Sequence, residues 1–137
     1  MATSDKKGPP TSRTLMMLLD SNIIIYAALN NDPLIEFIGA NAPFVSDISR
    51  VEVLGFQNIT DKETRFFNSF FESTILLSVS EEVILEAIRL RQQRKLALGD
   101  SIIAATAIVN NFALVTHNTK DFKWIDSLTL IDPFTDQ

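Results

Sequence analysis

The stretch LALGDSIIAATAIVNNFALVTHNTKDF, residues 96–122, decides which fold the sequence predicts. Its middle part, residues 102–109, is apolar almost all round, which is typical of a helix buried on every side. An apolar run at 112–115 predicts a buried strand, and a polar cluster at 116–121 follows it. A buried helix and a buried strand therefore lead directly into side chains that can bind a ligand.

Carboxylates stand at both edges of this buried part. Asp100 opens the helix, where we expect it to be the N-cap, and Asp121 follows the strand by a few residues. A buried carboxylate is costly unless hydrogen bonds or a cation compensate for its lost hydration. Each aspartate is therefore either a cap or loop residue, or part of a site, and the rest of the chain decides between these readings.

Strands and helices alternate along the whole chain. Strands are predicted at 15–19, 42–47, 74–79, 112–115 and, as a short edge strand, 128–132. Helices are predicted from Ser21 or Asn22 as N-cap, then at 32–39 ending at Gly39, 49–58, 61–73, 80–96 with Ser80 as N-cap, and 100–109, with one helical turn at 120–125. Because the strands are continuously apolar and not alternating, they predict an α/β fold with a mostly parallel sheet covered on both faces.

Composition predicts one globular domain. The chain has 137 residues, of which 46% are hydrophobic, so we expect a flexible tail at 1–13 and a single domain at 14–137. It has no cysteine, which excludes disulfides and thiolate chemistry. It has no apolar run of membrane-spanning length and no secretory signal, so we expect a cytoplasmic protein that does not contact membranes.

Four carboxylates are predicted to share one edge of the sheet. Asp20 ends the first strand, and Glu52 lies in the helix after the second strand, between apolar neighbours that leave it little exposed face. Asp100 and Asp121 follow later elements in the same way. Each alone has an ordinary reading as a cap or a solvent-facing residue. Ligands of parallel sheets bind beyond the carboxyl ends of the strands, which is where all four are expected.

Like charges that converge on one site raise some of their pKa values, and a hard divalent cation relieves the repulsion. The four acids therefore predict a Mg²⁺ or Mn²⁺ site that activates water against a phosphate ester. Supporting roles are expected for Thr116, Asn118 and Asn22, which can orient the carboxylates by hydrogen bonds. The net charge of −5 does not exclude a nuclease, because an acidic metal site contributes to it.

Other chemistries find little support. The chain contains no G-x-S-x-G, no P-loop and no G-x-G-x-x-G pattern. His117 is the only histidine, and we expect a loop residue near the site and not a catalytic one. A receiver-type phosphoacceptor domain also clusters aspartates at strand ends, but it needs an acidic pair in the first motif and a late lysine, which are not convincingly placed.

Four segments in order resemble the acidic motifs of PIN-domain ribonucleases, and most closely those of the short VapC-type toxins. They are LLDSNIIIYAAL, SRVEVLGF, LGDSIIAATAI and LVTHNTKDF, and the resemblance extends from about Leu15 to Asp132. It implies a three-layer α/β/α sandwich and an endoribonuclease that needs Mg²⁺ or Mn²⁺ and leaves 5′-phosphate and 3′-hydroxyl ends. It assigns the metal and the catalysis to Asp20, Glu52, Asp100 and Asp121, with Thr116 as a supporting hydroxyl.

The resemblance also implies partners: an RNA substrate, a cognate antitoxin that covers the groove, and a second copy in a homodimer. Asn118 departs from relatives that carry an acid there, which leaves the number of metal ions open. Candidates for RNA phosphate contacts are Arg89, Arg94, Lys95 and Lys120. The alternatives are that these cations only face solvent, and that the whole domain is a non-catalytic PIN-like module that binds protein or RNA.

Overall fold

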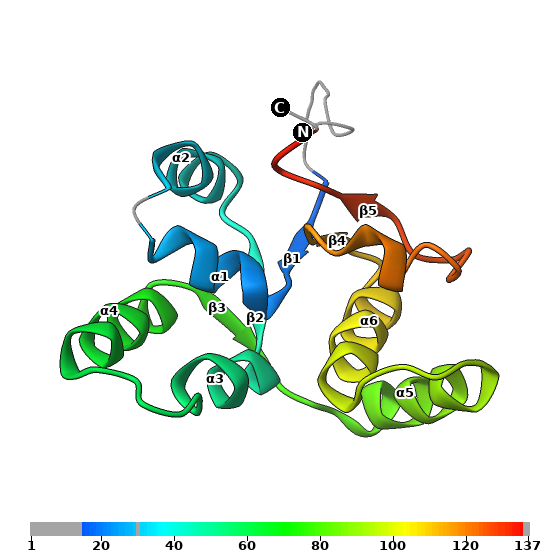
Figure 1. Ribbon diagram of the computed structural model, residues 1–137. Coiled ribbons are helices and arrows are strands. Elements are labelled where there is room, and N and C mark those ends of the chain that lie inside the picture. The colour runs from blue at the N-terminus through cyan, green and yellow to red at the C-terminus, as the bar shows by residue number, and fades with distance from the viewer. Residues whose placement is uncertain (1–14, 30, 136–137) are drawn as a thin grey trace, which may run out of the picture.

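The computed structural model describes residues 15–29 and 31–135, so the predicted tail at 1–13 lies outside the described residues. Within them, five strands form one parallel sheet (Figure 1). The strands are β1 (Met17–Leu19), β2 (Phe44–Ser46), β3 (Ile75–Leu77), β4 (Ala113–Val115) and β5 (Leu130–Ile131). All five were predicted, and β5 lies at the edge as expected.

The strand order β3-β2-β1-β4-β5 places the first strand in the centre. After β1 the chain builds outward to β2 and β3, and it later returns to the other side of β1 with β4 and β5. This reversal opens a crevice beyond the carboxyl ends of β1 and β4, which is where parallel sheets bind ligands. Asp20 and Thr116 are the residues that directly follow these two strands.

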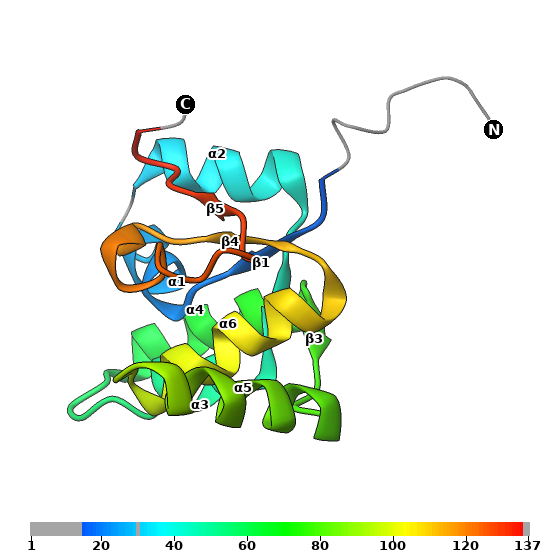
Figure 2. The same ribbon diagram turned by 90° about the vertical axis from the view of Figure 1, so that its right-hand side faces the viewer.

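Helices cover both faces of the sheet. The helices among the described residues are α1 (Ser21–Ala27), α2 (Asp32–Asn41), α3 (Asp47–Leu54), α4 (Asp61–Glu72), α5 (Glu81–Gln93), α6 (Leu98–Asn110) and the 3-10 turn η2 (Thr119–Asp121). Helices α5 and α6 pack side by side over one face (Figure 2). Helices α1 to α4 lie on the other side, which confirms the predicted α/β/α sandwich.

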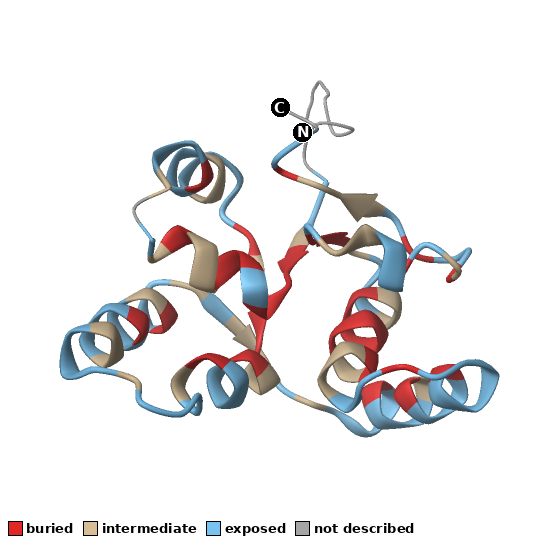
Figure 3. Ribbon diagram, in the orientation of Figure 1, coloured by how far each residue is buried: buried red, intermediate tan, exposed pale blue. Residues whose placement is uncertain are grey.

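Alternate residues of each strand pack into two hydrophobic cores, one on each face of the sheet. Leu18 and Leu114 pack with α5 and α6, whereas Leu19 and Val115 pack with the helices of the opposite face. This is the period of two that a strand imposes on its side chains. The central strands β1, β2 and β4 are mostly buried, whereas the edge strands β3 and β5 are only partly buried (Figure 3).

Helix ends were predicted less accurately. Ser80 is the N-cap of α5, as expected, and accepts a hydrogen bond from Val83 N. Helix α2 runs past Gly39 and ends at Asn41, because Ala42 adopts the left-handed conformation that stops it. The N-cap of α1 is Asp20 itself, in place of Ser21 or Asn22. Among the described residues, no helix is both long and apolar enough to cross a membrane.

Candidate active site

Asp20 is the most buried of the predicted acids. Its side chain is 4% exposed, and its backbone N–H donates to Val115 O of the neighbouring strand at 2.9 Å. Although Asp20 occupies the N-cap position, its side chain makes no capping bond. Burial raises the pKa of Asp20 above its usual value, and the charges of Glu52 and Asp121 add to this, while the Thr116 hydroxyl opposes it. A hydrogen bond with the Ser21 backbone also lowers the pKa of this carboxyl group, so Asp20 already has two hydrogen-bond partners.

Thr116 links Asp20 to Asp121. Its fully buried hydroxyl donates to Asp20 Oδ2 at 2.8 Å and accepts from Asn118 N at 3.0 Å. The Asn118 side chain in turn donates from Nδ2 to Asp121 Oδ2. Thr116 and Asn118 each donate to one of the acids, and their supporting roles stay a prediction.

Glu52 is held by serines from two helices. Ser21 Oγ donates to Glu52 Oε1 at 2.7 Å and lies 2.8 Å from Ser49 Oγ. Because Ser21 has one hydroxyl proton, Ser49 donates to Ser21 in this arrangement. The expectation that apolar neighbours bury Glu52 was wrong: Glu52 is exposed, and adjacent Val51 is 67% exposed.

Gly99 lets the Glu52 carboxylate reach the first turn of α6. A Cβ placed on Gly99 would stand 2.0 Å from Glu52 Oε2, so no other residue fits without moving Glu52. Sequence reasoning missed Gly99, Ser21 as a partner of Glu52, and Ser49. The one signal in the sequence was Gly99 itself, directly before Asp100. A glycine is unfavourable in the first turn of a helix, where alanine is preferred, so its presence indicates a close contact.

Asp100 lies in the first turn of α6 and is not its N-cap. The helix begins at Leu98 with Ala97 as N-cap, three residues before Asp100, so the predicted capping role of Asp100 is wrong. Burial first, and then the charges of Asp20, Glu52 and Asp121 in that order, together raise the pKa of Asp100 to about 6. Asp100 in α6 therefore feels the other three predicted acids, which come from the N-cap of α1, from α3 and from η2.

The donor set fits a hard divalent cation. It consists of carboxylate oxygens that repel one another, and Mg²⁺ and Mn²⁺ prefer such ligands. In the described part of the chain, no three histidine, cysteine, aspartate or glutamate side chains yet stand close enough together to hold an ion between them. The chemistry of the side chains, and not a formed cage, is what indicates the metal.

A basic cavity adjoins Asp121. It has a volume of about 380 Å³ and is lined by Arg94, Lys95, Lys120, Asp121, Lys123 and Trp124. The Arg94 guanidinium lies over the Trp124 ring, 5.6 Å from its centroid. The structure thus brings together three of the four cations predicted to contact RNA. Arg89 does not line this cavity and pairs instead with Glu86 on its own helix.

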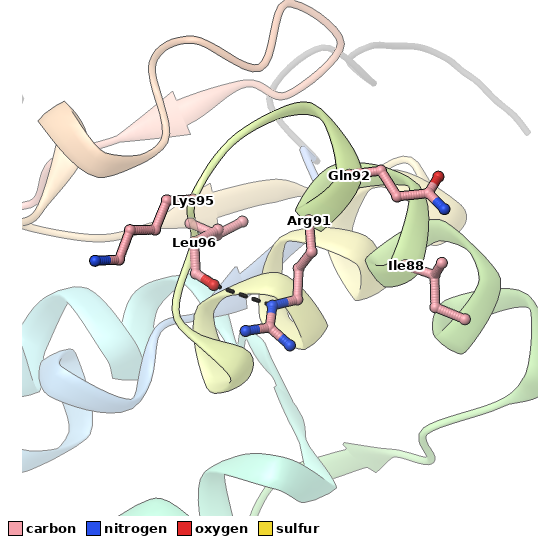
Figure 4. A pocket seen from close by; sticks show the side chains of 5 residues that line it. All are labelled: Ile88, Arg91, Gln92, Lys95 and Leu96. Carbon is pink, nitrogen blue, oxygen red and sulfur yellow. Dashed lines mark hydrogen bonds between the residues drawn. The ribbon is translucent and has the colours of Figure 1, made fainter.

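A second hollow lies beside the carboxyl end of α5 (Figure 4). Its volume is about 490 Å³, and its lining is Ile88, Arg91, Gln92, Lys95 and Leu96. Arg91 Nε donates to Leu96 O at 3.1 Å, so this arginine fixes the loop that leads into α6. No carboxylate lines this larger hollow, so it does not form part of the acidic site.

A third, smaller hollow adjoins the segment that follows β4. It is lined by Asn22, Tyr26, His117 and Asn118. The predicted supporting residue Asn22 is thus placed beside the site, together with the only histidine of the chain.

Comparison with known proteins agrees with this architecture. A sequence profile of the PIN domain family matches residues 17–128. No curated protein matches the chain. One chain of a toxin–antitoxin complex from Klebsiella pneumoniae is 27% identical with a TM-score of 0.72, and the alignment covers 85% of this chain and 97% of that one.

Two further solved structures are similar over nearly their whole length. A chain of VapBC-1 from nontypeable Haemophilus influenzae is 27% identical, with a TM-score of 0.72 and coverage of 88% of this chain and 100% of that one. A chain of VapBC2 from Rickettsia felis, solved with a promoter DNA fragment, is 23% identical, with a TM-score of 0.76 and coverage of 85% and 98%. At that identity the last likeness concerns the fold alone.

Proposed function

Because the chain belongs to the PIN domain family, we propose that it is an endoribonuclease that requires Mg²⁺ or Mn²⁺ and acts as the toxin of a toxin–antitoxin pair. The family match and the toxin–antitoxin complexes among the similar structures support a nuclease toxin in general terms. The metal, the RNA substrate and the residue roles are the further step, and they rest on the chemistry of the site. An RNA substrate would place its action in the cytoplasm.

One observation carries the proposal: four carboxylates from separate segments act on one another at the carboxyl ends of β1 and β4. The charges of three other acids contribute to the raised pKa of Asp100, and two of them contribute to that of Asp20. Repulsion between carboxylates does not stabilise the fold. Helix caps or solvent-facing acids would have no need to lie near one another. A bound cation explains why the four acids lie near one another.

Asp20, Glu52, Asp100 and Asp121 would hold the ion. A divalent cation, when bound, offsets charge on the phosphate and lowers the pKa of water in the site. Thr116 fixes the Asp20 carboxylate, and Ser21 fixes that of Glu52, each with a hydrogen bond shorter than 3 Å. Asn118 orients Asp121 in the same way. The chain's own contribution is therefore to orient these carboxylates by hydrogen bonds at one edge of the sheet.

The basic cavity supplies the phosphate contacts. Arg94, Lys95, Lys120 and Lys123 line it beside Asp121, so a cationic surface leads directly to one of the acids. This arrangement overcomes the net charge of −5 locally, where a polyanion would need it. Trp124 adds an aromatic face on which a base of single-stranded RNA can stack.

A protein antitoxin is the proposed regulator, because the similar structures from Klebsiella pneumoniae and Haemophilus influenzae are toxin–antitoxin complexes. Large apolar side chains exposed on α5, at Ile84, Leu85 and Ile88, are compatible with a protein partner. The homodimer stays a prediction, and size-exclusion chromatography with light scattering on the purified chain tests it.

The test of the proposal is cleavage of single-stranded RNA by the purified full chain with Mg²⁺ or Mn²⁺. We expect cleavage that EDTA abolishes and that Asp100→Asn lowers roughly 100-fold or more, since it removes charge from the site. Asp126→Asn is the matched control, because Asp126 is exposed and is not among the charges that shift Asp20 or Asp100. Equal cleavage by all three proteins would overturn the assignment. RNA binding without any cleavage would favour the non-catalytic module.

A further inference from the structure

The hollow lined by Asn22, Tyr26, His117 and Asn118 has the size and chemistry of a binding site for one planar ring. Its volume is about 160 Å³, well below the roughly 300 Å³ at which pockets for drug-sized ligands begin. Its lining combines two aromatic rings with two amide side chains, and it contains neither a carboxylate nor a lysine or arginine. A phosphate group would find no fixed cation there, whereas a nucleobase would find both a stacking face and hydrogen-bonding groups.

One wall of the hollow is a single turn of α1. Asn22 and Tyr26 are four residues apart, so both side chains project from the same side of the helix. Asn22 is exposed, and its amide can donate and accept hydrogen bonds. The helix therefore presents one polar and one aromatic group to the same space.

The adjoining wall is the His117 ring, which Asp132 and Phe134 hold in place. His117 Nδ1 lies 3.1 Å from Asp132 Oδ2 and 3.2 Å from Oδ1. A carboxylate can only accept, so the ring proton is on Nδ1, and a neutral ring then has Nε2 as an acceptor. The ring also packs against Phe134, with centroids 4.7 Å apart, and edge-to-face with Tyr26 at 6.2 Å. The His117 side chain nevertheless stays 50% exposed, so it can still meet a ligand.

The hollow is linked to the acidic site through Asn118. Asn118 belongs to its lining and also donates to Asp121, which lines the basic cavity. Thr116, which holds Asp20, accepts from the backbone of the same Asn118. A chain that runs from the basic cavity past the acids therefore reaches this hollow next.

We propose that this hollow is a specificity site that binds one nucleobase of the RNA adjoining the scissile phosphate. The perpendicular rings of Tyr26 and His117 give the base one stacking face and one edge contact, and Asn22 and Asn118 read the base edge. The inference rests on the proposed ribonuclease function. The two cavities divide the work: the basic one binds the phosphate backbone, and this one selects which base stands beside the cleaved bond.

The chain offers a direct probe, because it contains one histidine and one tyrosine. Their aromatic NMR signals in the full-length protein are therefore unambiguous. We expect adenosine, cytidine, guanosine and uridine 5′-monophosphates to shift the His117 and Tyr26 signals to different extents, with one or two bases clearly preferred. Ribose 5-phosphate is the control without a base, and it should leave them unmoved. Equal shifts with ribose 5-phosphate, or none with any nucleotide, would overturn the proposal.

Cleavage of a randomised single-stranded RNA pool, read out by sequencing the ends, gives the second measurement. His117→Ala and Tyr26→Ala should raise KM about 5- to 150-fold, as expected for loss of one stacked base, and should flatten the base preference at the cut. Tyr26→Phe retains the ring and should retain the preference, which separates stacking from loss of folding. Phe56→Ala, at another exposed aromatic, should change neither. An unchanged preference in His117→Ala would overturn the proposal.

The two proposals fail in different ways. If the nucleotides shift the NMR signals of His117 and Tyr26 but the wild-type chain does not cleave RNA, base binding in the hollow is supported and the ribonuclease function is refuted. If the chain cleaves RNA but neither aromatic signal responds and no variant alters the base preference, the function stands and the hollow falls.

Discussion

The Glu52 carboxylate lies directly against Gly99, so close that a Cβ on Gly99 would stand 2.0 Å from Oε2 and 2.8 Å from Cδ. This contact joins α3 to the first turn of α6, one residue before Asp100. The position of Glu52 therefore depends on the absence of a side chain at Gly99, next to Asp100. The acids are therefore arranged by their neighbours as well as by the strands that precede them.

Gly99→Ala is expected to displace Glu52 and lower RNA cleavage at least about 10-fold, with little change in stability, since disturbing a neighbour of a metal ligand typically costs about 10- to 100-fold. The clash is with the end of a flexible side chain, and alanine itself favours a helix. The measurements are kcat and the midpoint of thermal unfolding.

The matched control is Gly39→Ala in α2, where an added Cβ meets nothing within 4 Å. It should raise the free energy of unfolding by up to about 1 kcal/mol and leave cleavage unchanged. If Gly99→Ala cleaves RNA as well as Gly39→Ala does, the placement of Glu52 has no role in the activity.

Thr116→Val is expected to lower the free energy of unfolding by about 1.5–3 kcal/mol, because it leaves a buried carboxylate without its hydroxyl partner. The side chain keeps its size, so the loss reports the hydrogen bond and not a cavity. Urea denaturation at neutral pH with EDTA measures it. Thr116→Ser keeps the hydroxyl and should lose less than half as much; equal losses in both variants would contradict the account.

The metal-free protein is expected to lose stability as the pH rises from about 4 to about 6, through the contribution of Asp100. The pKa of Asp100 is raised from 3.8 to about 6, so the folded state binds its proton more tightly than the unfolded state does. That contribution is fully present below pH 3.8 and is lost above about 6. The pKa of Asp20 is also raised, which acts in the same direction.

Asp100→Asn removes this contribution together with the effect of the Asp100 charge on its neighbouring acids, while distant titrating groups cancel in the difference between wild type and variant. With EDTA present, the variant should be more stable than wild type at pH 7, and the advantage should disappear near pH 4. Urea unfolding at a series of pH values measures the difference. A constant difference across that range would mean that Asp100 does not titrate as its surroundings indicate.

Lys123→Ala is expected to weaken binding of single-stranded RNA to the inactive Asp100→Asn chain and to reduce the salt dependence of the binding constant. Each lost phosphate contact removes about 0.7 from the slope of log K against log salt. Lys62→Ala removes another exposed lysine, from α4, and should leave the slope unchanged. Equal slopes of log K against log salt for both variants would mean that RNA does not contact the basic cavity.

Much of the architecture could be predicted from the sequence, because it follows from strand ends. Asp20 follows β1 and Thr116 follows β4, and parallel pairing of the two strands necessarily brings them to one edge. The basic segment was harder to interpret. One helix and its end carry Arg89, Arg91, Arg94 and Lys95, but helical geometry sends them to different partners. Only the last two reach the cavity beside Asp121.

Contacts between distant side chains could not be predicted. The Glu52–Gly99 contact joins two helices whose relative position no local pattern encodes, and the same holds for Ser49 beside Ser21. Asp100 was expected as a cap because a polar residue before an apolar run is a common start signal. The helix instead begins two residues earlier, at Leu98, which lies 60% exposed. The side chains that contact His117 include Asp132 and Phe134, which follow strand β5 and not the strand before His117.

Binding of Mn²⁺, measured by isothermal titration calorimetry at neutral pH on the full chain, tests most directly whether the four acids form one metal site. We expect saturable binding to wild type and to Asp126→Asn, and binding at least about 10-fold weaker to Asp100→Asn, since a lost charged ligand weakens a site of hard oxygen donors. Equal affinity of Asp100→Asn and Asp126→Asn for Mn²⁺, or no binding to wild type, would contradict the account.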